Sequence, residues 1–327
     1  MTRRRKDTDY LFLSARIRSL EKNLLTAQRL EQLLQAPSAE SCSQLLTDLG
    51  YDPIRDEATL QESLKKQREA VFAELERFMP EKELLDVFRI KYDYHNIKVL
   101  LKAPEGAERL LMDAGTIPAG ELQRRYADSG NWQFLPRDMA AAAEKAAQLL
   151  AETGSAQRSD CVLDRACFDR LRQLAADSRC DYLQSYVRAM IDAANLRALV
   201  RTERMHMDPG FLQEVLFEGG SVPVDTLRAG AGNGAAALFR STALREAAEL
   251  GEAAVKGGSL TAFEKGCDNA VLKTAAGARR VPFGVEVALG YLIAKEAEWT
   301  AVRIVMAGRL AGLSADAIRE RLRDAYV

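Results

Sequence analysis

The amino-acid sequence predicts an all-α protein. Apolar residues recur at spacings of three and four along most of the chain, which is typical of helices with one buried face. Prolines interrupt the periodic segments, and the alternating Val, Ile and Thr runs that are typical of strands are nearly absent. With 327 residues, 47% of them apolar, the chain is long enough to bury one large core or several small ones.

The expected helices follow from where this periodicity begins and where it is broken. The first begins near Leu13, and Pro37 ends it. Prolines also lie just beyond three later periodic segments, where they cannot continue a helix. Ser314 is placed to cap a short final helix. We therefore expect long helices over residues 13–36, 57–79, 81–102, 181–205 and 285–310.

A short phrase occurs three times on these expected helices, with copies about 100 residues apart. The copies are KYDYHNIKVLLK from residue 91, MIDAANLRALVR from residue 190 and EAEWTAVRIVM from residue 296. Each has an acid, then an asparagine or alanine three residues later, then a cation. The aligned residues are Asp93, Asn96 and Lys98 in the first copy, Asp192, Asn195 and Arg197 in the second, and Glu298, Ala301 and Arg303 in the third.

The match between the first two copies extends beyond the helix. The segments DAGTIPAGEL (113–122) and EGGSVPVDTL (218–227) share a glycine, a proline and a leucine at equivalent positions. Each predicts a turn that leads into a new helix, and the third copy has the shortened version LAGLSADAI (310–318). We therefore expect three similar helical modules, 1–125, 126–230 and 231–327, which together form one compact unit.

The residue types of the phrase indicate a structural role. On a helix, Asp93, Ile97 and Leu100 share one face with Asn96 beside them, so an acid and an amide lie at the edge of an apolar stripe. Because buried polar groups are costly unless hydrogen-bonded, we expect them to bind an arginine or the free backbone N–H groups where a neighbouring helix starts. The favoured interpretation is that the pair fixes how helices cross within a module. An acid–base or metal pair is the alternative, which Ala301 disfavours because it breaks the set.

Other candidate sites fail on their spacing. The segment GAGNGAAA (230–237) lacks the GxGxxG pattern and a preceding strand, and VKGGSL (255–260) has no phosphate-binding loop around it. Five cysteines without a CxxC pair and two histidines indicate neither a disulfide framework nor a zinc site. The net charge of −1 gives no sign of a nucleic-acid footprint. We expect no catalytic, cofactor-binding or metal-binding residues, and no nucleic-acid or small-molecule partner.

The start of the sequence and its apolar segments were compared with the patterns of signal peptides and membrane-spanning helices. The start, MTRRRK, lacks the apolar stretch of a signal peptide. The Arg3–Lys6 run is interpreted as a solvated tail, with a weak attraction to anionic lipid headgroups as the alternative. No segment approaches the roughly 20 apolar residues that are needed to cross a bilayer.

Two terminal segments and the inner phrases resemble a known family. The opening YLFLSARIRSLEKNLL (10–25) is similar to the start of the C subunit of the V-type and A-type rotary ATPases, whose eukaryotic relative is called the d subunit. The ending is more specific, because Gly290-Tyr291, Lys295-Glu296, Glu298, Arg303 and Tyr326-Val327 match the family's carboxy-terminal phrase. The resemblance runs from about Tyr10 to the last residue. It departs at Ala301, where the family pattern favours asparagine.

The resemblance implies an architecture and a role. It implies three helical modules around a pseudo-threefold axis, forming a funnel that carries no nucleotide or cofactor and performs no chemistry. It implies a central-stalk rotor component, peripheral to the cytoplasmic face of the membrane. There the funnel receives the shaft made of the D and F subunits and sits on the membrane ring of proteolipid subunits. It transmits torque for ATP-coupled transport of protons or sodium ions.

Two other classes of protein remain as alternatives. An all-helical scaffold for unrelated soluble partners is the main one, but its usual repeats of about 34 to 47 residues do not match a period near 100. An all-α enzyme is disfavoured because the sequence offers no clusters of acids. Which ion is coupled, and whether the complex mainly makes or consumes ATP, stays open.

Overall fold

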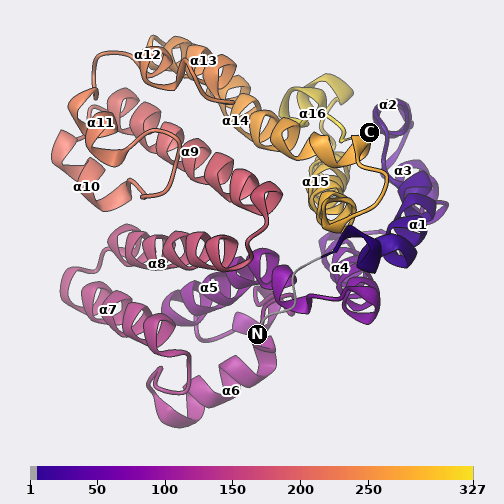
Figure 1. Cartoon of the computed structure of the whole chain (residues 1–327), viewed down its shortest axis with the longest axis horizontal. Coiled ribbons are helices and arrows are strands. Elements are labelled where there is room, and N and C mark those ends of the chain that lie inside the picture. The colour runs from indigo at the N-terminus through magenta and orange to yellow at the C-terminus, as the bar shows by residue number, and fades with distance from the viewer. Residues whose placement is uncertain (1–5, 327) are drawn as a thin grey trace. The chain divides into compact units, whose positions relative to one another are not determined.

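The computed structural model describes residues 6–326 of the chain (Figure 1). Every regular element in that range is a helix and none is a strand, which confirms the all-α class. Over the same residues, no helix combines the length and the apolar character that a membrane crossing requires. The chain divides into two compact units, one of Met1–Lys82 with Ala235–Val327 and the other of Glu83–Gly234.

The first unit is built from both ends of the chain. Its helix α15 packs against α1, α3, α4, α14 and α16, and most of its residues are buried. A helix surrounded on all sides is apolar all round, which explains why the segment from 287 to 294 contains no charged residue. The α-helices of this unit are α1 (Leu11–Leu20), α2 (Ala27–Gln35), α3 (Ala39–Thr47), α4 (Glu57–Phe78), α12 (Ala235–Phe239), α13 (Arg245–Val255), α14 (Leu260–Ala275), α15 (Val285–Leu310) and α16 (Ala315–Arg321).

The second unit is continuous in sequence. Helix α8 packs against α5, α7, α9 and α10, and Figure 1 shows α7 and α8 side by side. Gly154, in the left-handed conformation, ends α7, and the Ser155 side chain caps α8. The α-helices of this unit are α5 (Asp86–Lys102), α6 (Ala119–Ser129), α7 (Arg137–Thr153), α8 (Ala156–Asp177), α9 (Asp181–Arg204), α10 (Leu212–Val215) and α11 (Val224–Ala229).

The long helices predicted after residue 56 are confirmed, with small changes at their ends. Asp56 and Thr59 form a capping box that starts α4. Helix α5 begins at Asp86 rather than near residue 81, because a short 3-10 turn precedes it. Ser314 caps α16 as expected, since its hydroxyl accepts a hydrogen bond from the N–H of Ala317 at 3.3 Å.

The single helix predicted over residues 13–36 was wrong. The structure has two helices there, α1 and α2, separated by a short 3-10 turn and an extended Leu24. Thr26 caps α2 through a hydrogen bond from the N–H of Arg29 to its hydroxyl at 3.2 Å. The N–H of Leu25 donates to the side chain of Glu298, at 2.8 Å, instead of to a helical carbonyl. Because this partner lies at the far end of the sequence, local periodicity carries no sign of the break.

Candidate functional site

The acids of the repeated phrase hold the loop that precedes a short helix. Asp93, on α5, accepts hydrogen bonds from the N–H of Thr116 at 3.0 Å, from the Thr116 hydroxyl at 2.6 Å and from the N–H of Ile117 at 3.1 Å. Pro118 follows as the N-cap of α6. The carboxylate therefore satisfies backbone donors where a helix begins, which is a favourable place for negative charge.

The second copy repeats this arrangement within the same unit. Asp192, on α9, accepts a hydrogen bond from the N–H of Ser221 at 2.7 Å. Pro223 is the N-cap of α11, so the acid again binds two residues ahead of the cap. Asp93 is 0% exposed and Asp192 is 2% exposed, which confirms the expectation that both acids are buried and hydrogen-bonded.

The amide of the phrase binds the backbone at the start of the same loop. The side chain of Asn96 donates to the carbonyl of Met112 at 2.9 Å and accepts from the N–H of Met112 at 2.8 Å. Asn195 makes the same pair of bonds with the backbone of Phe217, both at 2.8 Å. Each asparagine thus replaces the backbone hydrogen bonds that a strand or helix would provide, and fixes the loop at a second point.

The glycines shared by these loops allow the acid to approach. A Cβ added at Gly115 would lie 2.1 Å from a carboxylate oxygen of Asp93, and one added at Gly220 would lie 2.5 Å from a carboxylate oxygen of Asp192. At those distances any other residue would displace the carboxylate or the loop. In each of the first two copies the aspartate therefore requires the glycine, although the two residues lie more than 20 positions apart in sequence.

Burial shifts the ionisation of these acids. Loss of hydration raises the pKa of Asp93 and of Asp192 above the usual aspartate value. The hydrogen bonds from Thr116 and Ser221 act against this shift, because they stabilise the ionised carboxylate. The pKa of both acids stays raised because the loss of hydration outweighs these hydrogen bonds.

In the third copy the acid holds the N-terminal segment of the chain. Glu298, on α15, accepts the hydrogen bond from Leu25, and Leu25 precedes Thr26, the N-cap of α2. The loop ahead of α2 is therefore held by α15 as the loop ahead of α6 is held by α5 and the loop ahead of α11 by α9. A buried leucine stands four residues after the N-cap in all three helices. These leucines are Leu30, Leu122 and Leu227.

The third copy also differs chemically from the other two. Its acid is longer by one methylene, and Asn23 stands three residues before the N-cap Thr26, where the other two loops have glycine three residues before theirs. A longer side chain reaches the loop from farther away, so no glycine is needed. The second Glu298 oxygen accepts from the Tyr51 hydroxyl at 2.6 Å and forms a buried ion pair with Lys295.

The Tyr51 and Lys295 contacts make this the most polar buried cluster of α15. The Lys295 ammonium also lies 5.5 Å from the centre of the Tyr51 ring. Burial, and then the charge of Glu298, raise the pKa of Tyr51 well above its usual value, so the phenol stays protonated and donates its hydrogen bond. Both carboxylate oxygens of Glu298 therefore accept hydrogen bonds, which a buried charge pair needs to offset its loss of hydration.

Ala301 occupies the asparagine position of the third copy, and a small cavity adjoins it. The cavity has a volume of about 20 Å³, and its lining includes Leu24, Glu298, Ala301 and Tyr326. That space is about the size that one water molecule needs.

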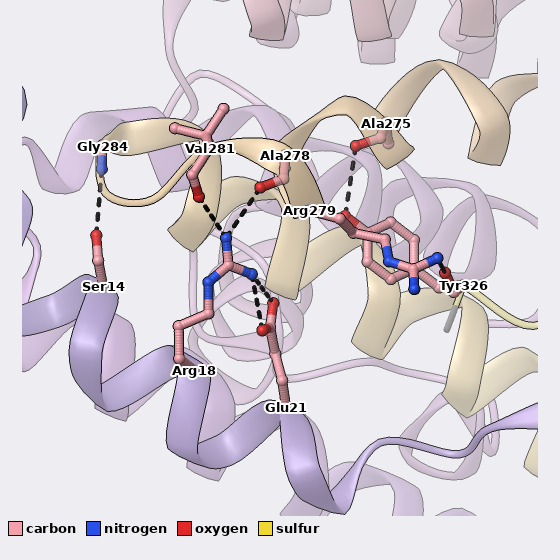
Figure 2. A network of polar contacts seen from close by, with 9 residues as sticks. All are labelled: Ser14, Arg18, Glu21, Ala275, Ala278, Arg279, Val281, Gly284 and Tyr326. Carbon is pink, nitrogen blue, oxygen red and sulfur yellow. Dashed lines mark hydrogen bonds and ion pairs between the residues drawn. The ribbon is translucent and has the colours of Figure 1, made fainter.

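A second polar network joins α1 to the turn that precedes α15 (Figure 2). The guanidinium of Arg18 donates to the carbonyls of Ala278 at 3.1 Å and Val281 at 2.5 Å. The hydroxyl of Ser14 accepts from the N–H of Gly284 at 3.2 Å. These bonds fix the backbone on the N-terminal side of α15, while Glu298 fixes its middle.

The carboxy-terminal segment enters the same network. Arg279 donates to the carbonyl of Tyr326 at 3.2 Å, and the Tyr326 hydroxyl donates to the carbonyl of Ala275 at 3.4 Å, as Figure 2 shows. Nearby, Arg323 pairs with Asp268 of α14 at 2.7 Å. Both ends of the chain are therefore fastened to the helices around α15.

The cations of the phrase do not share one role. Lys98 pairs with Asp164 of α8 at 2.6 Å, which links α5 to its neighbour. Arg197 is half-buried in α9, and Arg303 is exposed on α15. The structure thus brings the acids and amides of the phrase onto helix-preceding loops and leaves the cations on separate surfaces.

Sequence reasoning named Leu25 and Lys295 only as parts of the family resemblance and missed Tyr51 altogether, so it did not predict that these three residues are the partners of Glu298. It placed the loop of that copy after α15, at residues 310–318, because the other two loops follow their helices. One signal was present: the leucine four residues after a capping residue recurs at Leu30. Among residues 6–326, no group of three His, Cys, Asp or Glu side chains is placed to hold a metal ion.

Comparison with known proteins gives full-length relatives. One is the C subunit of a V-type sodium ATPase from Enterococcus hirae, 25% identical over 97% of this chain and 99% of its own length. Another is the C subunit of an A-type ATP synthase from Methanocaldococcus jannaschii, 25% identical over 96% of this chain and 86% of its own. The C subunit of a V-type ATP synthase from Thermus thermophilus is 26% identical over 93% of this chain and 94% of its own.

The sequence pattern of one family covers nearly the whole chain. The pattern that describes the ATP synthase (C/AC39) subunit matches residues 13–321. This range contains all three copies of the phrase and also Leu25, the partner of Glu298. The chain belongs to the ATP synthase (C/AC39) subunit family.

Proposed function

We propose that this protein is the central-stalk C subunit of a V/A-type rotary ATPase. In this role it performs no catalysis and binds no nucleotide. It receives the shaft of the D and F subunits at one end and rests on the proteolipid ring at the other. It sits on the cytoplasmic face of the membrane and transmits torque between ATP turnover and the transport of protons or sodium ions.

The observation that carries the proposal is the full-length match to C-subunit proteins. The relatives are named as parts of sodium-transporting or ATP-synthesising complexes, and the alignment spans at least 93% of this chain in the three described above. A match over the whole length supports a shared place in the complex more strongly than a match to one domain does.

The repeated contact supports a role in transmitting force. A part that carries torque must resist sliding of its helices, and each copy of the phrase ties a loop to a long helix through buried, charge-assisted hydrogen bonds. Such bonds have narrow geometric requirements, so they fix position more sharply than apolar packing does. Exposed catalytic groups are not needed for this task.

The proposal includes the three modules 1–125, 126–230 and 231–327, arranged as a funnel about a pseudo-threefold axis. Helix α2 would then belong to the first module in sequence and to the third in packing. The recurrence of the acid-to-loop contact on α5, α9 and α15 supports this arrangement. An experimental structure of the assembled complex tests it: these three helices should superpose under successive rotations of about 120°, and non-equivalent positions in their local bundles would contradict it.

Reconstitution tests the function itself. Membranes stripped of this protein should regain ion-coupled ATPase activity when the purified chain is added, while the chain alone should not hydrolyse ATP. The chain should also capture a purified D–F complex. Coupling that is unchanged without the protein, at full occupancy of head and ring, would reject the role. Absence of binding to both D–F and the ring would favour the alternative of a scaffold for unrelated soluble partners.

A further inference from the structure

The segment GAGNG at residues 230–234 contains the one asparagine of the sequence that a glycine follows, Asn233. The unit of Glu83–Gly234 ends in this segment, and the chain continues into α12 of the other unit. Asn233 is exposed. Gly232 and Gly234 on either side of it have φ angles of 82° and 93°, in the left-handed region that residues with a side chain rarely adopt.

The side chain of Asn233 and the peptide nitrogen that follows it are not held by other groups. Within residues 6–326, neither the side-chain amide of Asn233 nor the backbone N–H of Gly234 has a hydrogen-bond partner. The backbone N–H of Asn233 donates to the carbonyl of Gly230 at 3.0 Å, which leaves the side chain free to rotate. Rotation brings the side-chain carbon Cγ toward the nitrogen of Gly234, and glycine has no Cβ to crowd that approach.

The exposed Asn131 lies in a different chemical setting. Its side chain donates to the carbonyl of Ser129 at 3.2 Å and accepts from the N–H of Gln133 at 3.1 Å. The residue that follows it is Trp132, whose bulky side chain restricts access to the peptide nitrogen. Exposure alone therefore does not distinguish the two asparagines, whereas a free amide and a following glycine do. The asparagines of the repeated phrase are buried and doubly hydrogen-bonded, as described above.

We propose that Asn233 is a site of spontaneous deamidation and isomerisation. The nitrogen of Gly234 attacks Cγ of Asn233 and forms a cyclic imide, a succinimide. The bond between Cγ and Nδ2 breaks, and Nδ2 leaves as ammonia with the proton that the Gly234 nitrogen gives up. Water then opens the ring: addition at Cγ gives aspartate, and addition at the main-chain carbonyl carbon gives isoaspartate. Water is consumed and ammonia is released, so the reaction needs no oxidant, reductant or cofactor.

The product alters the chain where it passes from one unit to the other. Either acid adds a negative charge two residues before α12 begins, and isoaspartate also lengthens the main chain by the Cβ methylene. Because asparagine is thermolabile, this change accumulates with the age of the protein. The inference goes beyond the proposed function and does not depend on it.

Mass spectrometry of the purified full-length chain tests the proposal. The protein is incubated in heavy-oxygen water at neutral pH and is then digested with trypsin in ordinary water. In the peptide AGAGNGAAALFR (229–240), Asn233 carries the only side-chain amide, so the peptide mass reports its conversion to an acid. The acid should form progressively with heavy oxygen incorporated, and electron-transfer fragmentation should show both aspartate and isoaspartate. The rate should rise with pH, because the attacking nitrogen loses its proton.

The same digest contains a control. The peptide YADSGNWQFLPR (126–137) carries Asn131, which should stay largely unconverted. Gly234→Ala should slow the conversion of Asn233 several-fold, because the added Cβ crowds the attacking nitrogen. Asn233→Gln, which keeps the glycine, should slow it further, because the longer side chain must close a larger ring. Circular dichroism and thermal unfolding would show that each variant is folded.

Three results would overturn the proposal. The first is conversion of Asn233 no faster than that of Asn131. The second is an acid that lacks heavy oxygen, because it would have formed during the digestion. The third is aspartate alone, with an unchanged rate in Gly234→Ala, which would indicate direct hydrolysis of the amide by water instead of attack by the backbone nitrogen.

Discussion

The carboxylate of Glu298 accepts a hydrogen bond from the backbone N–H of Leu25 at 2.8 Å, although the two residues are 273 positions apart. This contact ties the segment that precedes α2 to the last long helix, α15. It gives the third copy of the phrase the loop that its own sequence lacks. The ends of the chain are thereby joined through the same kind of bond that Asp93 and Asp192 make within the other unit.

Removal of Glu298 should be strongly destabilising. Glu298→Ala leaves the ammonium of Lys295 buried without its carboxylate and the N–H of Leu25 without an acceptor. We expect a loss of about 3–5 kcal/mol in the free energy of unfolding, measured by urea denaturation. Glu249→Ala, which removes one partner of an exposed pair with Arg245, should cost less than about 1 kcal/mol. Similar losses in the two variants would show that Glu298 is not a buried anchor.

The aspartates of the first two copies should each carry part of the stability. Asp93→Ala and Asp192→Ala leave backbone donors at Thr116 and Ser221 without acceptors, so each should cost about 1–3 kcal/mol in thermal or chemical unfolding. Asp225→Ala is a matched control, because that aspartate side chain is 95% exposed on α11. Unfolding of both Asp93→Ala and Asp192→Ala at the parent's midpoint would assign these acids to another role.

The glycine next to Asp93 should not accept a side chain. Gly115→Ala puts a methyl group against the Asp93 carboxylate and should cost about 1–3 kcal/mol, whereas Gly120→Ala on α6, with open space around it, should be neutral or stabilising. A double-mutant cycle of Gly115→Ala with Asp93→Ala should show coupling, because the clash needs both side chains. Additive losses would mean that the glycine is required for another reason.

The contribution of Asp93 to the free energy of unfolding should depend on pH. Its folded pKa is raised from the ordinary value of 3.8, so the folded chain binds this proton more tightly than the unfolded chain does. The stability that Asp93 contributes is therefore fully present below 3.8 and decreases as pH rises through the folded pKa. Urea titrations of the parent and of Asp93→Asn, from about pH 4 to neutrality, measure the difference. A parent that gains stability relative to Asp93→Asn over this range would reverse the sign and contradict the shift.

The sequence by itself determined the helical class, the approximate extents of the long helices α4, α5, α9 and α15, and the repeated phrase. The helical features depend on contacts between neighbours in sequence: the spacing of apolar residues, the capping by Ser314 and the breaks at proline. The burial of Asp93 and Asp192 also followed from their place at the edge of an apolar stripe. Each of these signals is local, and a single sequence is enough to read it.

Only the tertiary structure decided which loop each acid holds. Gly115 and Gly220 were visible as a match, but their purpose appears only when a carboxylate lies against them. The break at Leu25 and the partners of Glu298 were not visible, because a hydrogen bond across 273 residues leaves no periodic trace along the chain. A helix that is amphipathic along its whole length can still be interrupted when a distant acid offers its backbone a stronger, charge-assisted partner.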